Sequence, residues 1–289
     1  MVFSYGITQQ GAYHVKNNTP CQDAHSFCRI SDRFAIGAVA DGLGSERYSD
    51  IAAKIAVSEA VNYCRDNLSD TSASDTITTV LNQAFSNALA CIENTAKENN
   101  HPLDQYDTTL AVVVFLDGNV YYGNSGDSGI VVLNADGTYE SITEQQRDDC
   151  GCVFPLCFGE EYWAFGTKND VASVFLATDG MYETLFPYLL KNEEVNIYVA
   201  LARFMMDNDL LKFSVENEAD IQKRMETFIS SIPGEQVSDD KTVLVMLDDS
   251  VCTQKQSDEY YAMPDWVKLK QKRDEEYMRE AYPHLFQEE

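Results

Sequence analysis

Residues 34–45 read FAIGAVADGLGS, and this stretch guides the interpretation of the rest of the sequence. It opens as a near-continuous apolar run, the pattern of a β-strand that is buried on both faces. The run ends abruptly at Asp41-Gly42, where a carboxylate meets a residue that lets the backbone approach a ligand closely. A buried strand that ends in an acid predicts a binding or catalytic site at that end of the strand.

The same pattern returns at later points in the chain. Asp127 follows VYYGNSG, Asp179 follows VASVFLAT, and Asp239 and Asp240 stand just before the apolar run TVLVML. Unpaired carboxylates are too costly to bury together, so we expect these side chains to converge on cations. Ligation by oxygen atoms alone is typical of Mg²⁺ or Mn²⁺.

Composition limits the classes of partner. The chain has 289 residues, of which 44% are hydrophobic, which suits one large domain with a short appendage. It carries 21 Lys and Arg against 47 Asp and Glu, a net charge of -26, so we expect no nucleic acid and no anionic membrane as partner. Any bound phosphate must then be attracted by metal. We see no basic-then-apolar leader and no apolar run of roughly 20 residues, and we expect a cytoplasmic protein.

Eight cysteines are present, and several fall inside apolar or helical patterns that suit small buried thiols. Cys150, Cys152 and Cys157 form the one local cluster. Its spacing does not match a common zinc knuckle and no His lies nearby. We therefore interpret it as a loop with incidental thiols, and a structural zinc site is the alternative.

Periodicity along the chain predicts an α+β fold. Strands come in a block and then alternate irregularly with helix pairs, which favours helices covering antiparallel sheets over a doubly wound parallel sheet. Residues 110–133 predict an antiparallel meander, and residues 138–170 a long irregular excursion near the site. Helices are expected near 49–63, 74–92, 195–206 and 216–230, and further strands at 171–177 and 242–247.

After Asp249 the composition becomes polar and charged. Pro264 stands at a plausible first helical position shortly before Trp266, so residues 250–289 are predicted to form a C-terminal helical extension. Trp266 is the obvious anchor. It would serve either packing on the core or a partner, and the sequence leaves both open.

Short motifs that contain Asp recur in a definite order along the chain. They are QD at 22–23, ADGLG at 40–44, DTTL at 107–110, GDS at 126–128, ATDG at 177–180 and DDKT at 239–242. Each motif alone is weak, but the ordered set resembles the type 2C metal-dependent Ser/Thr protein phosphatases, the PPM family. The resemblance covers a domain of residues 1–249, and the segment before Asp23 looks most like the bacterial-type branch. It implies a four-layer α/β/β/α sandwich of two antiparallel sheets flanked by helices.

The resemblance also assigns metal-binding positions. Asp41 would bridge two Mg²⁺ or Mn²⁺ ions, and Gly42 would offer its backbone carbonyl to one of them. Asp179 and Asp240 would ligate the other ion. Asp127 matches a position that is associated in the family with a third, weaker metal.

The chemistry implied by the resemblance follows from the metals. A water that bridges them loses much of its proton affinity, becomes hydroxide near neutral pH and attacks phosphorus in line, while the cations offset the developing charge. Asp23 and Asp41 are the catalytic candidates, with Asp23 holding metal-bound water. No covalent phospho-enzyme is needed, which agrees with the lack of a Cys or Ser nucleophile among the motifs.

Two departures from the family pattern concern the phosphate group. Leu43 stands where animal members have a His that is proposed as general acid, so protonation of the leaving group would fall to metal-bound water. The family Arg that holds phosphate has no match at Asn18. Lys16 or His14 would take its place, and a solvated loop residue is the alternative reading of both.

We therefore expect metal-dependent hydrolysis of phosphoserine and phosphothreonine in proteins that are targets of a Ser/Thr kinase. A catalytically weak or silent phosphatase-like sensor, which recruits a partner through residues 250–289, is the alternative. A metal-free acidic α+β domain is the third hypothesis, and it predicts that Asp41→Asn changes little beyond solubility. Turnover in the presence of metal separates these hypotheses.

Overall fold

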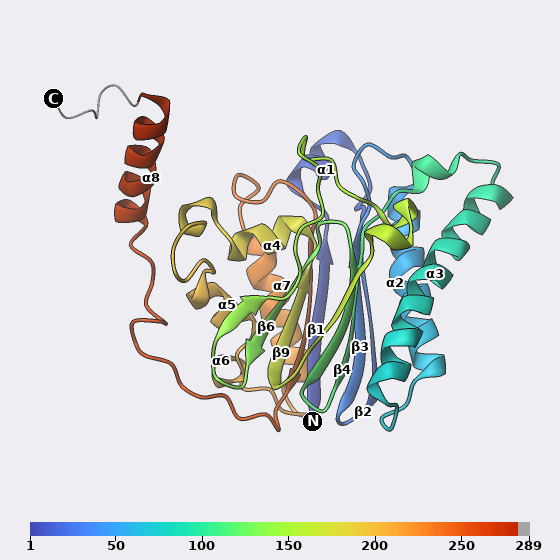
Figure 1. Ribbon diagram of the computed structural model, residues 1–289, viewed down its shortest axis with the longest axis horizontal. Helices are drawn as coiled ribbons and strands as arrows, with labels where there is room; N and C mark the ends of the chain where they lie inside the picture. The colour runs from blue at the N-terminus through green and yellow to red at the C-terminus, as the bar shows by residue number, and fades with distance from the viewer. Residues whose placement is uncertain (283–289) are drawn as a thin grey trace.

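The computed structural model describes residues 1–282, which form two five-stranded antiparallel sheets packed face to face, with helices on both outer faces (Figure 1). The strand order is β1-β10-β9-β6-β7 in one sheet and β2-β3-β4-β5-β8 in the other. The predicted α+β fold, a four-layer sandwich, is thus confirmed. The strands are β1 (Val2–Gln9), β2 (Asp23–Ser31), β3 (Phe34–Asp41), β4 (Leu110–Leu116), β5 (Asn119–Ser125), β6 (Gly129–Asn134), β7 (Tyr139–Ser141), β8 (Ala164–Lys168), β9 (Val171–Ala177) and β10 (Lys241–Asp248).

Strand β3 is buried on both faces, as its sequence predicted. Ala35 and Val39 belong to the apolar layer between the two sheets, together with Leu244 of β10. Ile36 and Ala40 belong to the apolar layer between this sheet and its helices. Because successive side chains of a strand point to opposite faces, a strand in the middle of four layers must be apolar throughout.

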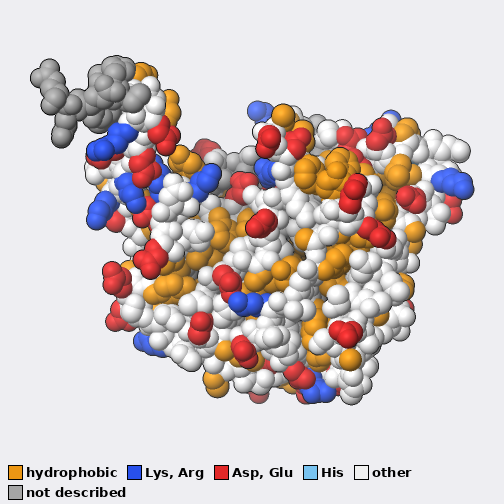
Figure 2. Space-filling model, viewed as in Figure 1, with side chains coloured by type: hydrophobic (Ala, Val, Ile, Leu, Met, Phe, Trp, Pro, Cys, Tyr) orange, Lys and Arg blue, Asp and Glu red, His pale blue; other side chains and the backbone are white. Residues whose placement is uncertain are grey.

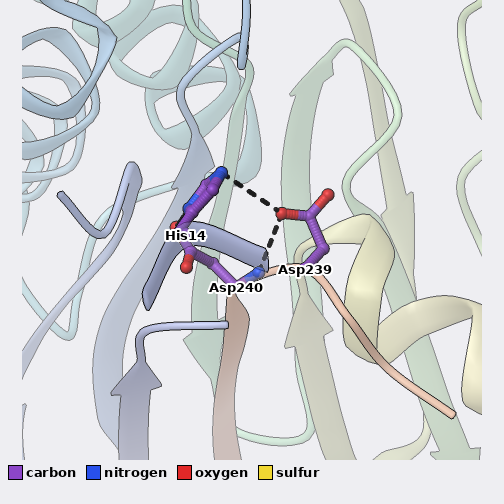
Figure 3. Close-up of side chains that lie close together, drawn as sticks. All are labelled: His14, Asp239 and Asp240. Atoms are coloured by element: carbon purple, nitrogen blue, oxygen red, sulfur yellow. Dashed lines mark hydrogen bonds and ion pairs between the residues drawn. The ribbon is translucent and has the colours of Figure 1, made fainter. Parts of the chain in front are cut away.

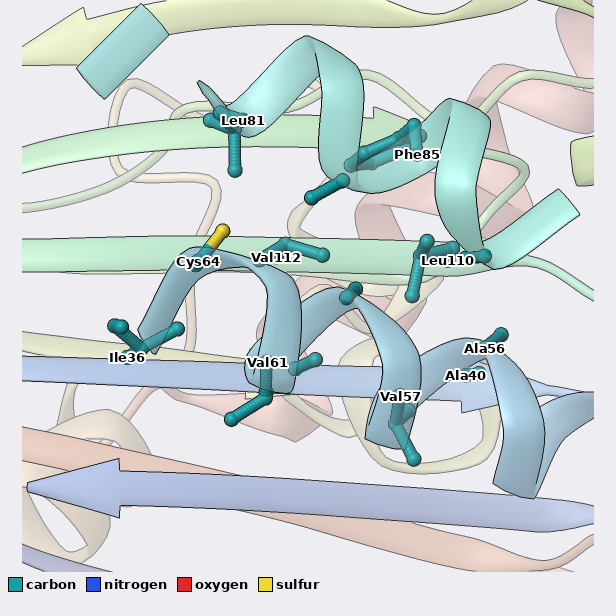
Figure 4. Close-up of a cluster of buried hydrophobic side chains, with 14 of the residues drawn as sticks. Ile36, Ala40, Ala56, Val57, Val61, Cys64, Leu81, Phe85, Leu110 and Val112 are labelled. Atoms are coloured by element: carbon teal, nitrogen blue, oxygen red, sulfur yellow. The ribbon is translucent and has the colours of Figure 1, made fainter. Parts of the chain in front are cut away.

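Helices α2 and α3 cover the sheet that contains β3. Val61 and Cys64 of α2 and Leu81 and Phe85 of α3 pack in one cluster with Val112 of β4 (Figure 4). Helices α4, α5 and α7 pack on the other sheet. None of the helices within residues 1–282 is both long and apolar enough to cross a membrane. The helices are α1 (Ala12–Asn17), α2 (Ser49–Asn67), α3 (Ser74–Glu98), α4 (Asp179–Leu185), α5 (Val199–Met206), α6 (Asn208–Leu211), α7 (Glu218–Ser231) and α8 (Trp266–Ala281).

The first and last strands of the sandwich are neighbours. Val2 pairs with Asp248 at one end of this ladder, and Gln9 pairs with Lys241 at the other. The loop that follows β1 and the loop that precedes β10 therefore meet at the same end of the sheet.

The predicted antiparallel meander over residues 110–133 is correct for two strands and wrong for the third. β4 and β5 form a hairpin in which Leu110 lies opposite Ser125, but β6 leaves this sheet and pairs with β7 and β9 of the other one. The chain crosses at Gly126, whose φ of 97° is a left-handed conformation that glycine adopts readily. Apolar alternation identifies a strand without saying which of two packed sheets receives it.

Residues 138–170, predicted as an irregular excursion, contain two strands as well as loop. β7 extends one sheet beside β6, and β8 pairs with β5 at the edge of the other. The intervening segment contains two short 3-10 helices and is otherwise mostly irregular. Short edge strands bury little apolar surface, so their sequence pattern is weak.

The predicted C-terminal extension packs against the body of the molecule. The backbone N–H of Tyr139 donates a hydrogen bond to the Tyr260 hydroxyl (2.9 Å), and the Arg203 guanidinium lies 4.2 Å from the centre of the Tyr261 ring. Figure 1 shows α8 beside the segment between α4 and α5. Of the two roles left open, packing on the core is observed. The domain boundary itself stays a prediction, and residues 283–289 of the extension lie outside the described residues.

All eight cysteines are free. Cys150 and Cys152 are exposed, and the Cys157 thiol donates to the Asp107 carboxylate (2.8 Å). Within residues 1–282, no group of potential metal ligands includes a cysteine. This agrees with a loop that carries incidental thiols.

Phe85 is fully buried and packs against Phe165 (5.2 Å between ring centres) and Trp163 (5.5 Å). We expect Phe85→Ala to lower the free energy of unfolding by about 3–5 kcal/mol, because the truncation leaves a cavity. Tyr188→Ala is the control, since that side chain is 70% exposed, and it should change stability by less than about 0.5 kcal/mol. Chemical denaturation measures both variants, and equal effects would contradict the assigned core.

Candidate active site

Two neighbouring strands bring Asp23 and Asp41 together. Asp23 opens β2, Asp41 ends β3, and the register pairs them directly. The Asp41 N–H donates to Thr109 Oγ1 (2.9 Å), and its carbonyl oxygen accepts from the Thr109 N–H (2.8 Å) and the Thr108 hydroxyl (3.0 Å). No residue within 1–282 donates a hydrogen bond to the Asp41 carboxylate. The backbone is therefore fixed, and both carboxylate oxygens are available.

Gly42 is required by the close approach of α2. A Cβ atom at this position would lie 2.6 Å from the backbone carbonyl group of Ser49, the first residue of α2. The Gly42 N–H donates to the Gln22 carbonyl oxygen (3.1 Å), and Gln22 Nε2 donates to Ser49 Oγ (2.5 Å). The turn after Asp41 is thus held between the start of β2 and the start of α2.

The carboxylates at this end of the sheets repel one another. The Asp23 side chain is buried and accepts a hydrogen bond from the Thr178 hydroxyl (2.7 Å). Burial raises the pKa of Asp23 well above its usual range, and the Thr178 hydrogen bond opposes that rise. Burial likewise raises the pKa of Asp41, and repulsion adds to it from Asp23, Asp179, Asp127 and Asp239. A cation among these groups would relieve the repulsion.

Sequence analysis did not single out Arg147, yet its guanidinium lies between two predicted metal ligands. Arg147 Nη2 lies 2.6 Å from Asp127 Oδ2 and 3.1 Å from Asp179 Oδ2. Burial and repulsion by Asp179 raise the pKa of Asp127 to about 6, and Arg147 opposes that rise. The sequence shows Arg147 only as a lone Arg in the stretch TEQQRDD, and the local pattern does not predict that it contacts Asp127 and Asp179.

A cavity of about 330 Å³ opens beside Asp41 and Gly42. Of the two predicted phosphate-binding residues, His14 lines this cavity, whereas Lys16 is exposed on α1 and does not line it. Asp239 also contributes to the lining. The cavity therefore joins the turn after β3, helix α1 and the loop before β10.

Asp240, a predicted metal ligand, uses its carboxylate to hold the backbone. Oδ1 accepts the Gly11 N–H and Oδ2 accepts the Gln22 N–H, both at 2.6 Å. His14 Nδ1 lies 2.8 Å from the same Oδ2. Both oxygens are engaged by groups of the protein, so Asp240 joins the segments on either side of α1 to the start of β10.

The neighbouring Asp239 is the acid of this pair that faces the cavity. Its side chain is 57% exposed, and its Oδ1 lies 3.8 Å from His14 Nε2 (Figure 3). Successive side chains at the start of a strand point to opposite sides, so the Asp-Asp pair sends one carboxylate into the body and one into the cavity. The sequence alone does not tell which is which.

A protein-family model described as Protein phosphatase 2C matches residues 10–230. The chain belongs to the protein phosphatase 2C family. The predicted resemblance to type 2C metal-dependent Ser/Thr phosphatases, and with it the enzyme class, is confirmed. No curated protein matches the chain significantly in sequence.

Solved bacterial structures share the phosphatase 2C fold of this chain. The serine/threonine phosphatase Stp1 from Staphylococcus aureus has a TM-score of 0.60 at 14% identity, covering 86% of this chain and 95% of that one. The Mycobacterium tuberculosis phosphatase PstP/Ppp has a TM-score of 0.59 at 15% identity, covering 88% and 99%. A structure of the PstP catalytic domain in complex with 2 manganese ions has a TM-score of 0.56 at 15% identity, covering 85% and 97%. At these identities the likeness shows the fold alone.

The donors at this phosphatase 2C site fit Mn²⁺ or Mg²⁺. Neither carboxylate oxygen of Asp41 has a hydrogen-bond donor among residues 1–282, and the groups that repel Asp41 are also carboxylates. Within the described part of the chain, the ligand atoms of His14, Asp239 and Asp240 lie within 4.8 Å of one another. Hard oxygen donors in excess over other ligand types favour these two ions over zinc.

The raised pKa values of Asp23 and Asp41 predict how the metal-free protein responds to pH. The folded state keeps protons that the unfolded state has released, so the contribution of these two groups to stability is greatest below the usual carboxyl pKa of about 4 and falls as pH rises through the folded values. We expect Asp41→Asn to reduce this fall and to raise the Tm of chelator-treated protein at neutral pH. Thermal unfolding against pH measures it, with the exposed Asp149→Asn as control. A Tm lower than that of the unmodified chain would contradict the repulsion.

Proposed function

We propose that this chain hydrolyses phosphoserine and phosphothreonine in proteins with Mn²⁺ or Mg²⁺. The observation that carries the proposal is the Asp41 carboxylate, whose backbone is fixed, which has no hydrogen-bond donor in the described part of the chain, and which has other carboxylates around it. Such a group is stable in its ionised form only beside a cation. Metal-dependent hydrolysis needs this arrangement and needs no nucleophilic side chain.

In this proposal two metal ions bind at the end of the sandwich. Asp41 and the Gly42 carbonyl would hold one ion, and Asp41, Asp179 and Asp239 would hold the other. Asp239 takes the place first assigned to Asp240, because the Asp240 oxygens already accept backbone N–H groups.

A third, weaker ion would bind at Asp127. The Arg147 guanidinium lies against that carboxylate in the structure, 2.6 Å from Oδ2. A third ion would therefore have to displace Arg147, which supports a weaker site there than at Asp41.

When bound, the ions would activate water for attack near neutral pH and offset the charge that develops on phosphorus. The side chains of the protein would position the water and the phosphate group. Asp23, oriented by the Thr178 hydroxyl, would hold water next to Asp41. His14 would contact the phosphate from the cavity wall, and the exposed Lys16 would act only from outside it. Because Leu43 offers no proton, water would protonate the leaving group.

The substrate in this proposal is a protein phosphorylated by a Ser/Thr kinase. The net charge of -26 argues against nucleic acid or an anionic membrane as partner. We propose the cytoplasm as its location, where such substrates occur.

Hydrolysis of a chromogenic aryl phosphate tests the proposed function. We expect turnover with Mn²⁺ or Mg²⁺ that stops when a chelator is added. Asp41→Asn should lower kcat/KM by more than about a hundredfold, since charge stabilisation at phosphorus is lost, while Asp149→Asn should leave it unchanged.

Turnover that persists in Asp41→Asn, or that needs no metal, would reject the proposal. Mn²⁺ binding without any turnover would instead favour the alternative, a sensor that recruits a partner.

Asp239 and Asp240 form a matched pair that tests the ligand assignment. Asp239→Asn should weaken Mn²⁺ binding by at least about tenfold and should not lower the metal-free Tm, because it removes a charge that repels Asp41. Asp240→Asn should lower stability by about 1–3 kcal/mol, because an amide cannot accept both backbone N–H groups. Calorimetric titration with Mn²⁺ and thermal unfolding measure the two effects. Weaker Mn²⁺ binding in Asp240→Asn together with lower stability in Asp239→Asn would instead identify Asp240 as the metal ligand.

A further inference from the structure

A second cavity, of about 650 Å³, adjoins the catalytic centre on the side of the C-terminal extension. Asp239 lines this cavity as well as the catalytic one, so the two meet at that residue. Asp179 lies on its wall, and so does Trp266, the first residue of α8. We call this cavity the flanking groove. The extension therefore forms part of the surface next to the proposed metal site.

Trp266 has a defined position, because the extension is held on both sides of it. Its ring packs edge-on against Tyr198, with 5.1 Å between the ring centres. Further along α8, Arg273 is only 5% exposed and its Nη2 donates to Glu193 Oε1 (2.8 Å). A buried guanidinium is stable only with such partners, so α8 is fixed against the body rather than loosely attached.

The flanking groove is lined by apolar, acidic and neutral polar side chains, and none of the described residues that line it is Lys, Arg or His. Trp266 and Leu201 supply apolar surface. Two of the three carboxylates are proposed metal ligands, which leaves Glu183 to interact with another group. The Glu183 side chain is 60% exposed, and the nearest cation among the described residues is Arg147 at 3.7 Å. A side chain with an apolar stem and a positively charged end fits this surface.

We propose that the flanking groove binds a Lys or Arg side chain of the phosphoprotein substrate, close in sequence to the phosphorylated residue. The aliphatic stem would pack on Trp266 and Leu201, and the charged end would meet Glu183 and the Trp266 ring. The net charge of -26 favours the approach of a basic peptide. This inference rests on the proposed function, since it names the substrate class of the same site.

Phosphothreonine peptides that carry Arg, norleucine or Gln at one position at a time test the inference. Release of phosphate by the intact chain with Mn²⁺ gives kcat/KM for each peptide. We expect the Arg peptide to exceed the norleucine peptide by about tenfold at one position, as a cation–π contact and a partly exposed ion pair together supply. The advantage should shrink at high salt. Equal values for Arg and norleucine at every position would overturn the proposal.

Variants connect this preference to the flanking groove. Trp266→Ala and Glu183→Gln should each reduce the ratio of Arg to norleucine several-fold. Val267→Ala is the matched control, because this neighbouring side chain is 69% exposed and does not line the groove, and it should keep the ratio. The ratio is compared within one variant, so a general loss of activity does not affect it. A ratio that survives in both groove variants would overturn the proposal.

Aryl phosphate hydrolysis by the unmodified chain reports separately on the proposed function. If that hydrolysis is absent, the dissociation constants of the same peptides, measured by calorimetry, decide the inference. Tighter binding of the Arg peptide that is lost in Trp266→Ala supports the groove. Equal binding of the Arg and norleucine peptides rejects it.

Discussion

Carboxylates that repel one another are held close together at one end of the sandwich. Asp23 and Asp41 are direct neighbours in a β-ladder, so the register sets their separation. The surrounding elements hold them there through Thr109 just before β4, Thr178 beside β9 and the contact of Gly42 with α2. Three apolar layers make these elements rigid. The fold thus supplies the stability that a cluster of like charges lacks without metal.

Asp240 and Asp239 are adjacent and carry the same side chain, but they differ in burial and in hydrogen bonding. Asp240 is nearly fully buried, and it is satisfied because two backbone N–H groups from the other end of the sequence, at Gly11 and Gln22, donate to it. These bonds supplement the ladder between β1 and β10 and close the domain next to the site. Asp239 faces the cavity; its Oδ1 accepts the Asp240 N–H (2.8 Å), and its Oδ2 stays available to a ligand. A buried carboxylate with charge-assisted hydrogen bonds needs no cation, whereas a carboxylate that faces a cavity can still accept one.

Features that belong to a single segment could be predicted from the sequence, and so could the convergence of the acids at the strand ends, but the particular partners of a segment could not. The residues of β3 alone predict that it is buried on both faces and that it ends in an acid. Whether β6 joins one sheet or the other depends on β9, which lies about forty residues later in the chain. The choice between Asp239 and Asp240 depends on Gly11 and Gln22, and the placement of Arg147 depends on Asp127. Local periodicity carries no information about these partners.

The position of the C-terminal extension likewise depends on contacts with distant segments. Composition marks residues 250–289 as different from the rest, but only the contacts of Arg273 and Trp266 show that part of this segment borders the site. The proposed metal ligands come from strand ends, where register and repulsion leave little room for change. The outer wall of the flanking groove comes from a helix that carries none of those ligands. In the proposed enzyme, selection among phosphoproteins can therefore vary through the extension while the geometry of the metal centre stays the same.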